Sequence, residues 1–286
     1  MKFGLFAINM GPCTSPEVAK RAAVAAENAG FDSLWAGEHV VLPDPQAPPS
    51  PLPPEAPMLD PTVALAFLAG HTKTVRLGTG IIILPQRNPL VLAKELASLD
   101  VLSNGRLTFG IGIGYLKPEF DALGIPFEQK GARTEEYLQA MLAIWTMDEP
   151  KFEGRFASFS GVQARPRPVQ KPHPEIVFGG HTPEAFRRAA RLARGWYGFA
   201  LDVERTKSCL EGLHEACRAA GRRFEDLEIS VTPVPERDNL VLDRDTAKRF
   251  ADLGVDRLIL YSPRARDEAG VLGIVGEVEK NLIGKI

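Results

Sequence analysis

The chain of 286 residues carries 34 basic and 36 acidic side chains, and this net charge of −2 excludes a strong basic field for nucleic acid or an anionic membrane. Its hydrophobic content of 44% is too high for a disordered protein and permits a large core. No apolar run approaches the ~20 residues that a membrane-spanning helix requires, and no secretory leader is visible. We therefore expect a cytoplasmic protein with a small-molecule partner, and neither nucleic acid nor membrane as a partner.

The cysteines and histidines predict neither disulfides nor a metal site. Cys209 and Cys217 lie eight residues apart on one predicted helix, about 12 Å by helical rise, which is too far for a disulfide. The five histidines show no paired spacing of the kind that binds zinc. We expect reduced thiols and no metal.

Short apolar runs alternate with longer helical patterns along the chain, and we count eight of each. Most of the runs lack polar alternation, as expected for strands buried on both faces. The predicted strands span residues 3–8, 33–36, 76–83, 107–113, 175–178, 196–199, 228–234 and 257–261. Because right-handed crossovers close such a series into a ring, the pattern predicts one domain over residues 1–286, folded as a (β/α)8 TIM barrel.

Helix starts and two long loops complete this organisation. A capping residue followed by proline begins four predicted helices, at Ser15-Pro16, Asp60-Pro61, Asn88-Pro89 and Thr182-Pro183. Residues 42–61 hold nine of the 24 prolines and follow the second strand, so we expect a lid or pocket wall at the C-terminal face, where barrel active sites lie. Residues 148–174 should lie at the opposite face and contain a small hairpin.

The second strand ends in two residues that could carry chemistry. His39 places an imidazole at the predicted mouth of the barrel, where it could exchange a proton with a substrate. The alternative, that it caps or bonds a neighbouring loop, has equal weight. Glu38 is the main carboxylate near a strand end, and its alternative role is that of a solvated loop charge.

Glycines mark the next three strand ends. Gly80 in the third strand predicts a bulge or a close approach of ligand. In the fourth strand, Gly110-Ile111-Gly112-Ile113-Gly114-Tyr115 either clears space for a flat ligand or serves strand packing, and it is no dinucleotide fingerprint. In the fifth, Gly179-Gly180-His181-Thr182-Pro183 leads into a helix whose free amides could bind phosphate, the alternative being an ordinary tight turn.

Taken together and in order, these strand ends resemble the luciferase-like monooxygenase superfamily, in particular its coenzyme F420-dependent oxidoreductases. The resemblance covers nearly the whole chain. Its segments are residues 27–39, 77–89, 98–106, 110–115, 131–137 and 178–180.

The resemblance implies a deazaflavin or flavin lying across the C-terminal mouth. A bulge in the third strand, with a non-prolyl cis peptide at Gly80-Ile81, would back its central ring, and His39 would be the catalytic residue that relays a proton. The cofactor contacts implied are Glu38, Thr79, Gly80, Ile81, Gly112, Ile113, Gly114, Tyr115, Gly179, Gly180, His181 and Thr182. Family habit implies a homodimer, with a separate F420 or flavin reductase as a further partner.

Departures from the family pattern narrow the range of expected substrates. Members that oxidise sugar phosphates carry a glutamate where Tyr115 stands, and the sixth strand ends in Phe199-Ala200 rather than in cations. The loop at residues 232–242 is short for a true luciferase. We expect an apolar or aromatic substrate pocket.

The first interpretation is an F420-dependent oxidoreductase that transfers a hydride between the deazaflavin and a small apolar organic substrate. Lys117, Arg133 and Arg187 are candidates for a cationic rim around the F420 tail, with solvated helix charges as the alternative. The second interpretation is an FMN-dependent monooxygenase that uses reduced flavin and oxygen. Two others are a non-catalytic flavin-binding barrel and a cofactor-free isomerase or lyase that binds a substrate phosphate.

Overall fold

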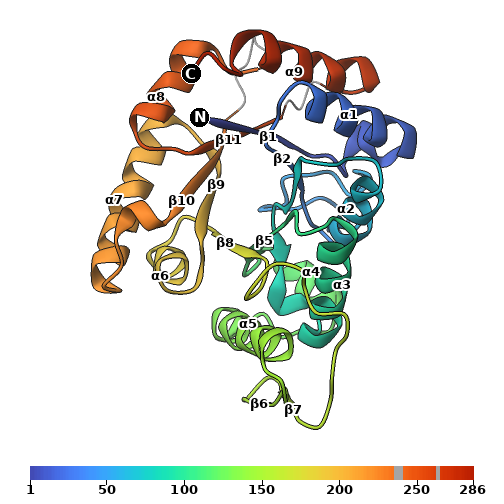
Figure 1. The fold of residues 1–286 in the computed structure, drawn as a ribbon, viewed down its shortest axis with the longest axis vertical. Coiled ribbons are helices and arrows are strands. Elements are labelled where there is room, and N and C mark those ends of the chain that lie inside the picture. The colour runs from blue at the N-terminus through green and yellow to red at the C-terminus, as the bar shows by residue number, and fades with distance from the viewer. Residues whose placement is uncertain (235–240, 262–264) are drawn as a thin grey trace.

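The computed structural model describes residues 1–234, 241–261 and 265–286 and shows parallel strands in a ring with helices outside it (Figure 1). The strands are β1 (Lys2–Phe6), β2 (Ser33–Ala36), β3 (Arg76–Thr79), β4 (Ile82–Ile83), β5 (Leu107–Gly112), β8 (Glu175–Gly179), β9 (Gly195–Leu201), β10 (Glu228–Pro233) and β11 (Arg257–Leu260). They run in the order β3-β2-β1-β11-β10-β9-β8-β5-β4, and a pairing of β3 with β5 closes the ring. The predicted TIM barrel is confirmed.

The third predicted strand is interrupted. It forms β3 and β4, which both pair with β5, while Gly80 and Ile81 lie between them outside the ladder. The predicted irregularity is therefore confirmed, but the cis peptide implied at Gly80-Ile81 is wrong. Every cis bond among the described residues precedes a proline. The break in the ladder redirects the chain without a cis bond, and the Gly80 N–H still donates to the Ala36 carbonyl at 2.7 Å.

Eight long or medium helices cover the outside of the ring in the described part of the chain. They are α1 (Pro16–Asn28), α2 (Pro61–Ala69), α3 (Pro89–Leu102), α5 (Lys130–Thr146), α6 (Pro183–Leu192), α7 (Val203–Ala219), α8 (Arg244–Asp252) and α9 (Glu268–Asn281). The side chains of Asp60, Asn88 and Thr182 cap their helices as predicted, whereas Ser15 makes no side-chain cap bond. A short additional helix, α4 (Lys117–Ala122), was not predicted.

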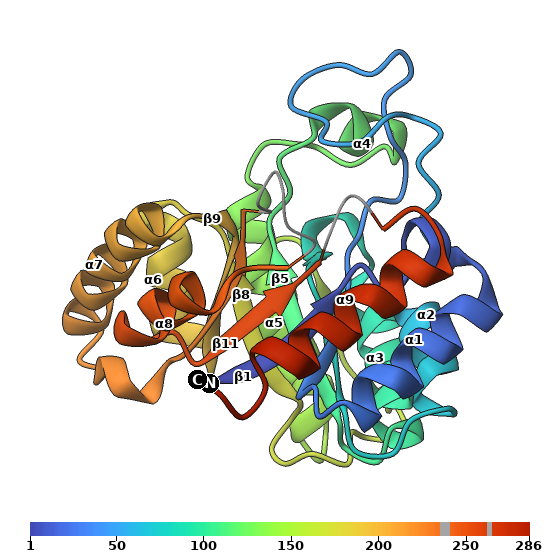
Figure 2. The ribbon, with the colours of Figure 1, turned by 90° about the horizontal axis from the view of Figure 1, so that it is seen from above.

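The two long loops lie on opposite sides of the barrel. The segment between β2 and α2 rises beside α4 on one side, away from both termini (Figure 2). The predicted hairpin forms from β6 (Phe152–Glu153) and β7 (Ser158–Phe159), below α5 in Figure 1. The loop predicted at residues 232–242 includes residues 235–240, which lie outside the described residues.

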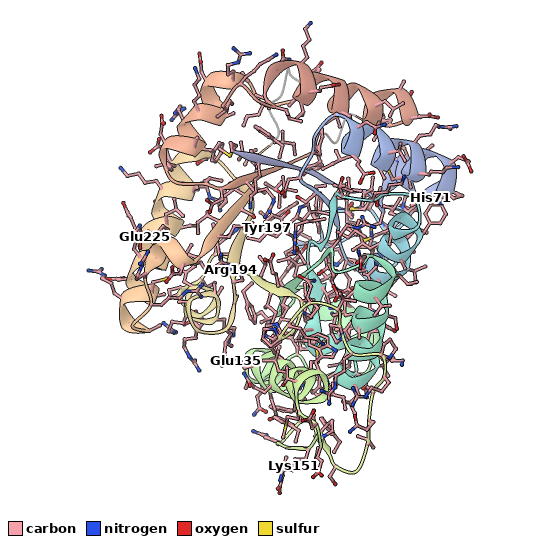
Figure 3. All side chains as sticks on the ribbon, viewed as in Figure 1. His71, Glu135, Lys151, Arg194, Tyr197 and Glu225 are labelled. Atoms are coloured by element: carbon pink, nitrogen blue, oxygen red, sulfur yellow. The ribbon has the colours of Figure 1, made fainter. Side chains whose placement is uncertain are left out.

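The interior of the barrel is filled, so any ligand must bind above it. At the N-terminal end, buried Arg257 bonds Asp32 at 2.7 Å and also bonds Glu228. Above it lies a buried layer made of Phe6, Trp35, Val177, Tyr197 and Ile259, against which Ala7, Met10, Ile81 and Tyr261 pack while partly exposed. Tyr197 lies within the ring, whereas His71 and Lys151 lie at the periphery (Figure 3). The partly exposed residues form the floor of the mouth.

A partly exposed carboxylate, Glu27, ties α1 to the segment that leads into β3. Glu27 accepts backbone N–H bonds from Lys73 at 2.8 Å, Thr74 at 2.6 Å and Val75 at 2.9 Å. Burial alone would raise the pKa of Glu27, but these bonds lower it to about 2. Because the folded-state pKa is depressed, the contribution to stability is present above the unfolded pKa of about 4.3 and is lost as pH falls towards 2.

We expect Glu27→Ala to lower the free energy of unfolding at neutral pH by about 1–3 kcal/mol, because three backbone donors lose a charged acceptor. Urea unfolding at pH 7 and at pH 3 measures this, and the difference from the unmodified protein should shrink at the lower pH. Glu17→Ala, an exposed change on the same helix, should have an effect below ~0.5 kcal/mol. An equal loss of unfolding free energy in both variants would contradict the stabilising role given to Glu27.

Candidate functional site

Three polar side chains from separate elements meet at the C-terminal mouth. His39, just after β2, has its Nδ1 3.3 Å from Glu119 Oε2 on α4. Its Nε2 lies 3.3 Å from the Tyr115 hydroxyl, in the loop between β5 and α4. The His39 and Tyr115 rings meet edge to face with centroids 5.8 Å apart. The structure therefore brings together two predicted site residues and one, Glu119, that was not predicted.

Glu119 is an ionised acceptor inside this group. Its side chain is fully buried, and its Oε1 accepts the Val40 N–H at 2.6 Å. Burial alone would raise the pKa of Glu119, but the hydrogen bonds with His39 and with the Val40 N–H lower it. A carboxylate cannot donate, so Nδ1 of neutral His39 carries the hydrogen. Nε2 is then the acceptor and the Tyr115 hydroxyl donates to it.

Glu38 belongs to a separate ionic cluster beneath the mouth. Its carboxylate accepts the Ile83 N–H at 2.5 Å and two bonds from Arg87, which also bonds Asp60 at 2.6 Å. Burial raises the pKa of Glu38 despite the Arg87 charge. Both oxygens of Glu38 thus have protein partners, and the cluster joins the end of β2 to β4 and to the cap of α2. The cofactor contact predicted for Glu38 stays a prediction.

The glycines of β5 and β8 accommodate side chains of the interrupted strand. Thr79 Oγ1 accepts the Gly110 N–H at 2.7 Å and donates to the Gly110 carbonyl at 2.9 Å. A Cβ on Gly112 or Gly179 would lie 2.9 or 1.9 Å from side-chain atoms of Ile81. Strand packing therefore accounts for these glycines, and the space beside them is filled by Thr79 and Ile81. Ile81 itself lies at the floor of the mouth, whereas Gly80 is buried.

The turn between β8 and α6 has the geometry expected from its sequence. Gly180 adopts φ +113°, a region that favours glycine, and Thr182 caps α6 by accepting the Ala185 N–H at 3.3 Å. His181 Nε2 accepts the Phe199 N–H at 3.2 Å, so this nitrogen is unprotonated. Desolvation and the positive charge of Arg205 lower the pKa of His181. Arg205, which was not predicted, adds positive charge near the turn.

Aromatic rings from β1, β9 and the end of β11 lie together at the mouth. The Phe6 ring lies 5.3 Å from that of Phe199 and 5.4 Å from that of Tyr261, and the Phe199 and Tyr261 rings stack at 6.1 Å. Phe199 is 38% exposed. An exposed aromatic surface at this position suits a flat or apolar ligand. Only Phe199 of the three was expected to line the pocket.

The three candidates for a cationic rim have protein partners. Lys117 pairs with Asp121 at 2.7 Å and Arg187 with Glu184 at 2.8 Å, all four on exposed helix surfaces. Arg133 is buried and donates to the Pro126 carbonyl at 2.7 Å. Lys117 and Arg187 are therefore ordinary solvated helix charges, the alternative given above. Arg133 instead fixes the loop that contains Pro126.

Two kinds of site are missing from the described ranges of the chain. Among residues 1–234, 241–261 and 265–286, no group of His, Cys, Asp and Glu side chains could hold a metal ion. Within the same ranges, no helix has the length and apolarity to cross a bilayer. All three cysteines are free and buried.

Comparison with known proteins shows the family of this barrel. Residues 1–236 match the luciferase-like monooxygenase family, to which the chain belongs. It is 32% identical over 280 residues to an uncharacterised Mycobacterium tuberculosis protein, Rv0953c, covering 94% of this chain and 95% of that protein. It is 33% identical over 164 residues to an FMNH2-dependent dimethylsulfone monooxygenase of Pseudomonas putida, covering 56% and 44%.

Solved structures share the whole fold. The monooxygenase RslO1 of Streptomyces bottropensis superposes with a TM-score of 0.80 at 25% identity, covering 99% of both chains. An F420-dependent secondary alcohol dehydrogenase in complex with an F420-acetone adduct gives a TM-score of 0.77 at 19% identity, covering 99% and 98%. The Pseudomonas putida relative is FMNH2-dependent and the alcohol dehydrogenase is F420-dependent, and the family match confirms the resemblance seen in the sequence.

Proposed function

We propose that this protein is an F420-dependent oxidoreductase that transfers a hydride between the deazaflavin and a small apolar organic substrate. The observation that carries the proposal is the arrangement of the mouth. The mouth combines a histidine with a defined acceptor nitrogen, a group of aromatic rings and an apolar floor. Such a site provides orientation and a proton path, and leaves the hydride chemistry to a cofactor.

The residues present fit a flat tricyclic ring with a phosphate-bearing arm. Ile81 and Met10 offer an apolar surface for the ring. The turn at Gly180, with the amides that begin α6 and the nearby charge of Arg205, suits a phosphate. When bound, the deazaflavin would supply hydride transfer. His39 Nε2 would be the group that finally stores or supplies the proton lost or gained at the substrate oxygen, and the aromatic rings would exclude water from the reacting atoms.

The second candidate is an FMN-dependent monooxygenase, supported by the monooxygenases of Pseudomonas putida and Streptomyces bottropensis described above. The two functions differ in their need for oxygen. Anaerobic reduction of F420 by a panel of apolar secondary alcohols, or anaerobic oxidation of reduced F420 by the matching ketones, would support the first. Oxygen-dependent product formation with reduced FMN and no anaerobic F420 turnover would overturn it. In either case a separate reductase is proposed to recycle the cofactor.

We also propose that the protein forms a homodimer through α2 and α3. Helix α2 has no charged residue, and its outward Val63 and Phe67 are 66% and 40% exposed. Val91 and Leu102 on the adjoining α3 are also exposed. A helix that is apolar on all sides is normally buried, and a second copy presenting the same face would bury it.

We expect Val63→Glu to shift the dimer towards monomer, because it places two buried charges at the contact. The variant should fold, since a glutamate in the first turn of a helix interacts favourably with the helix dipole. Light scattering after size exclusion measures the mass across a range of concentrations. Val162→Glu, an exposed valine beyond β7, is the matched control and should leave the dimer intact. A monomer at every concentration before mutation would contradict the proposal.

A further inference from the structure

We propose that Glu119 is the positioning residue of the site and that Tyr115 connects His39 to the substrate, so that Tyr115, His39 and Glu119 form one proton relay. The inference rests on the proposed function, whose proton-transfer group it completes. The relay consists of two contacts, one between the Tyr115 hydroxyl and His39 Nε2 and one between His39 Nδ1 and Glu119 Oε2, and each distance is 3.3 Å.

The exposure of the three side chains shows which end of the relay faces the substrate. The Glu119 side chain is fully buried and that of His39 is 9% exposed, whereas Tyr115 is 49% exposed. The carboxylate therefore forms the closed end, and the tyrosine hydroxyl forms the end that a ligand can reach. A buried carboxylate hydrogen-bonded to Nδ1–H holds an imidazole in one tautomer and stabilises its protonated form without taking the proton itself.

The proton step balances with hydride transfer. When an alcohol is oxidised, its O–H bond breaks and its proton passes to the Tyr115 oxygen, while the hydrogen of Tyr115 moves to His39 Nε2. A bound deazaflavin would supply the acceptor for the hydride that the carbon–hydrogen bond gives up as the carbonyl forms. The product side holds an imidazolium opposite the Glu119 carboxylate, and reduction of a carbonyl reverses each transfer.

Glu119 has a second partner that makes its two oxygens necessary. Oε1 accepts the Val40 N–H at 2.6 Å at the start of the proline-rich loop, while Oε2 serves His39. The two donors lie on different oxygens of Glu119, and in a glutamine one of these positions is an NH2 group that donates, so it would face either the Val40 N–H or the Nδ1–H donor to donor. Glu119→Gln should therefore release either the loop or the imidazole, although it is nearly the same size.

The test is nitrogen NMR of protein with labelled histidine, recorded without cofactor near pH 8, with the His39 signal identified by its loss in His39→Asn. We expect Nδ1 of His39 to be protonated and Nε2 unprotonated, and Glu119→Gln to abolish this fixed tautomer. Asp121→Asn, which removes a charge from the exposed face of the same helix, should keep it. An Nε2–H tautomer before mutation, or a tautomer unchanged by Glu119→Gln, would overturn the proposal.

Tyr115→Phe supplies the second readout. It should leave the Nδ1–H tautomer in place, shift the Nε2 resonance, and lower kcat about tenfold or more with little change in cofactor affinity. An unchanged Nε2 resonance would remove Tyr115 from the relay. Because the tautomer is measured in the absence of cofactor, a failure of F420 binding would leave the NMR result intact, and the two failures can be told apart.

Discussion

Replacing His39 with alanine should lower kcat for F420-dependent turnover by about 10²- to 10⁴-fold, the range usual for loss of a general acid–base group. The Kd for F420 should change by less than about threefold, ~0.7 kcal/mol, because the apolar floor and the turn at Gly180 are untouched. Stopped-flow reduction of F420 by the best alcohol of the panel, with a separate binding titration, measures both quantities.

Two further variants make the His39 result interpretable. His39→Asn keeps a donor for the buried Glu119 but cannot take a proton at Nε2, so it should fold normally and be as inactive as the alanine variant. His71→Ala removes an exposed imidazole at the periphery and should leave turnover unchanged (Figure 3). Unchanged turnover and unchanged F420 affinity in His39→Asn would exclude the proton role.

Gly110→Ala should cost at least 3–5 kcal/mol of stability or prevent folding. A Cβ at this position would lie 2.0 Å from the Thr79 carbonyl oxygen, a backbone atom that cannot rotate away. The displacement would also break the two hydrogen bonds between Thr79 and Gly110 that hold β3 against β5 where the third strand is interrupted. Large costs of this kind arise from overpacking in a core that has no space to give.

The loss is measured as a fall in the midpoint of urea unfolding, followed by circular dichroism. Gly276→Ala is the matched control, because a Cβ there meets nothing within 4 Å and the residue lies inside α9. Alanine at that position should be neutral or stabilise by up to ~1 kcal/mol. A Gly110→Ala protein as stable as the control would contradict the packing described for Thr79.

The strands and most helix starts could be predicted because their signals are local. A continuous apolar run marks a strand buried on both faces, and proline after Asp60, Asn88 or Thr182 marks a helix start whichever neighbours surround it. The interruption at Gly80 was also visible, since glycine within a strand removes the side chain that packs there. His39 and Tyr115 could be proposed because each follows a strand end.

The partners of these residues could not be predicted because they depend on long-range contacts. Glu119 lies 80 positions from His39, on a six-residue helix too short to show periodicity. The tasks of Gly112 and Gly179 depend on where Ile81 points, which only the folded barrel determines. The sequence likewise shows that Glu38 follows a strand end, but only the fold shows that its carboxylate oxygens accept hydrogen bonds from Arg87 and Ile83.

The most direct test of the central claim is titration of the purified protein with F420 and, separately, with FMN at matched ionic strength, following ligand fluorescence. The proposed function predicts a Kd for F420 that is micromolar or lower and a Kd for FMN at least tenfold higher, a difference of ~1.4 kcal/mol. Tighter binding of FMN would contradict F420 dependence and favour the monooxygenase. Binding of neither would contradict the assignment of the mouth as a cofactor site.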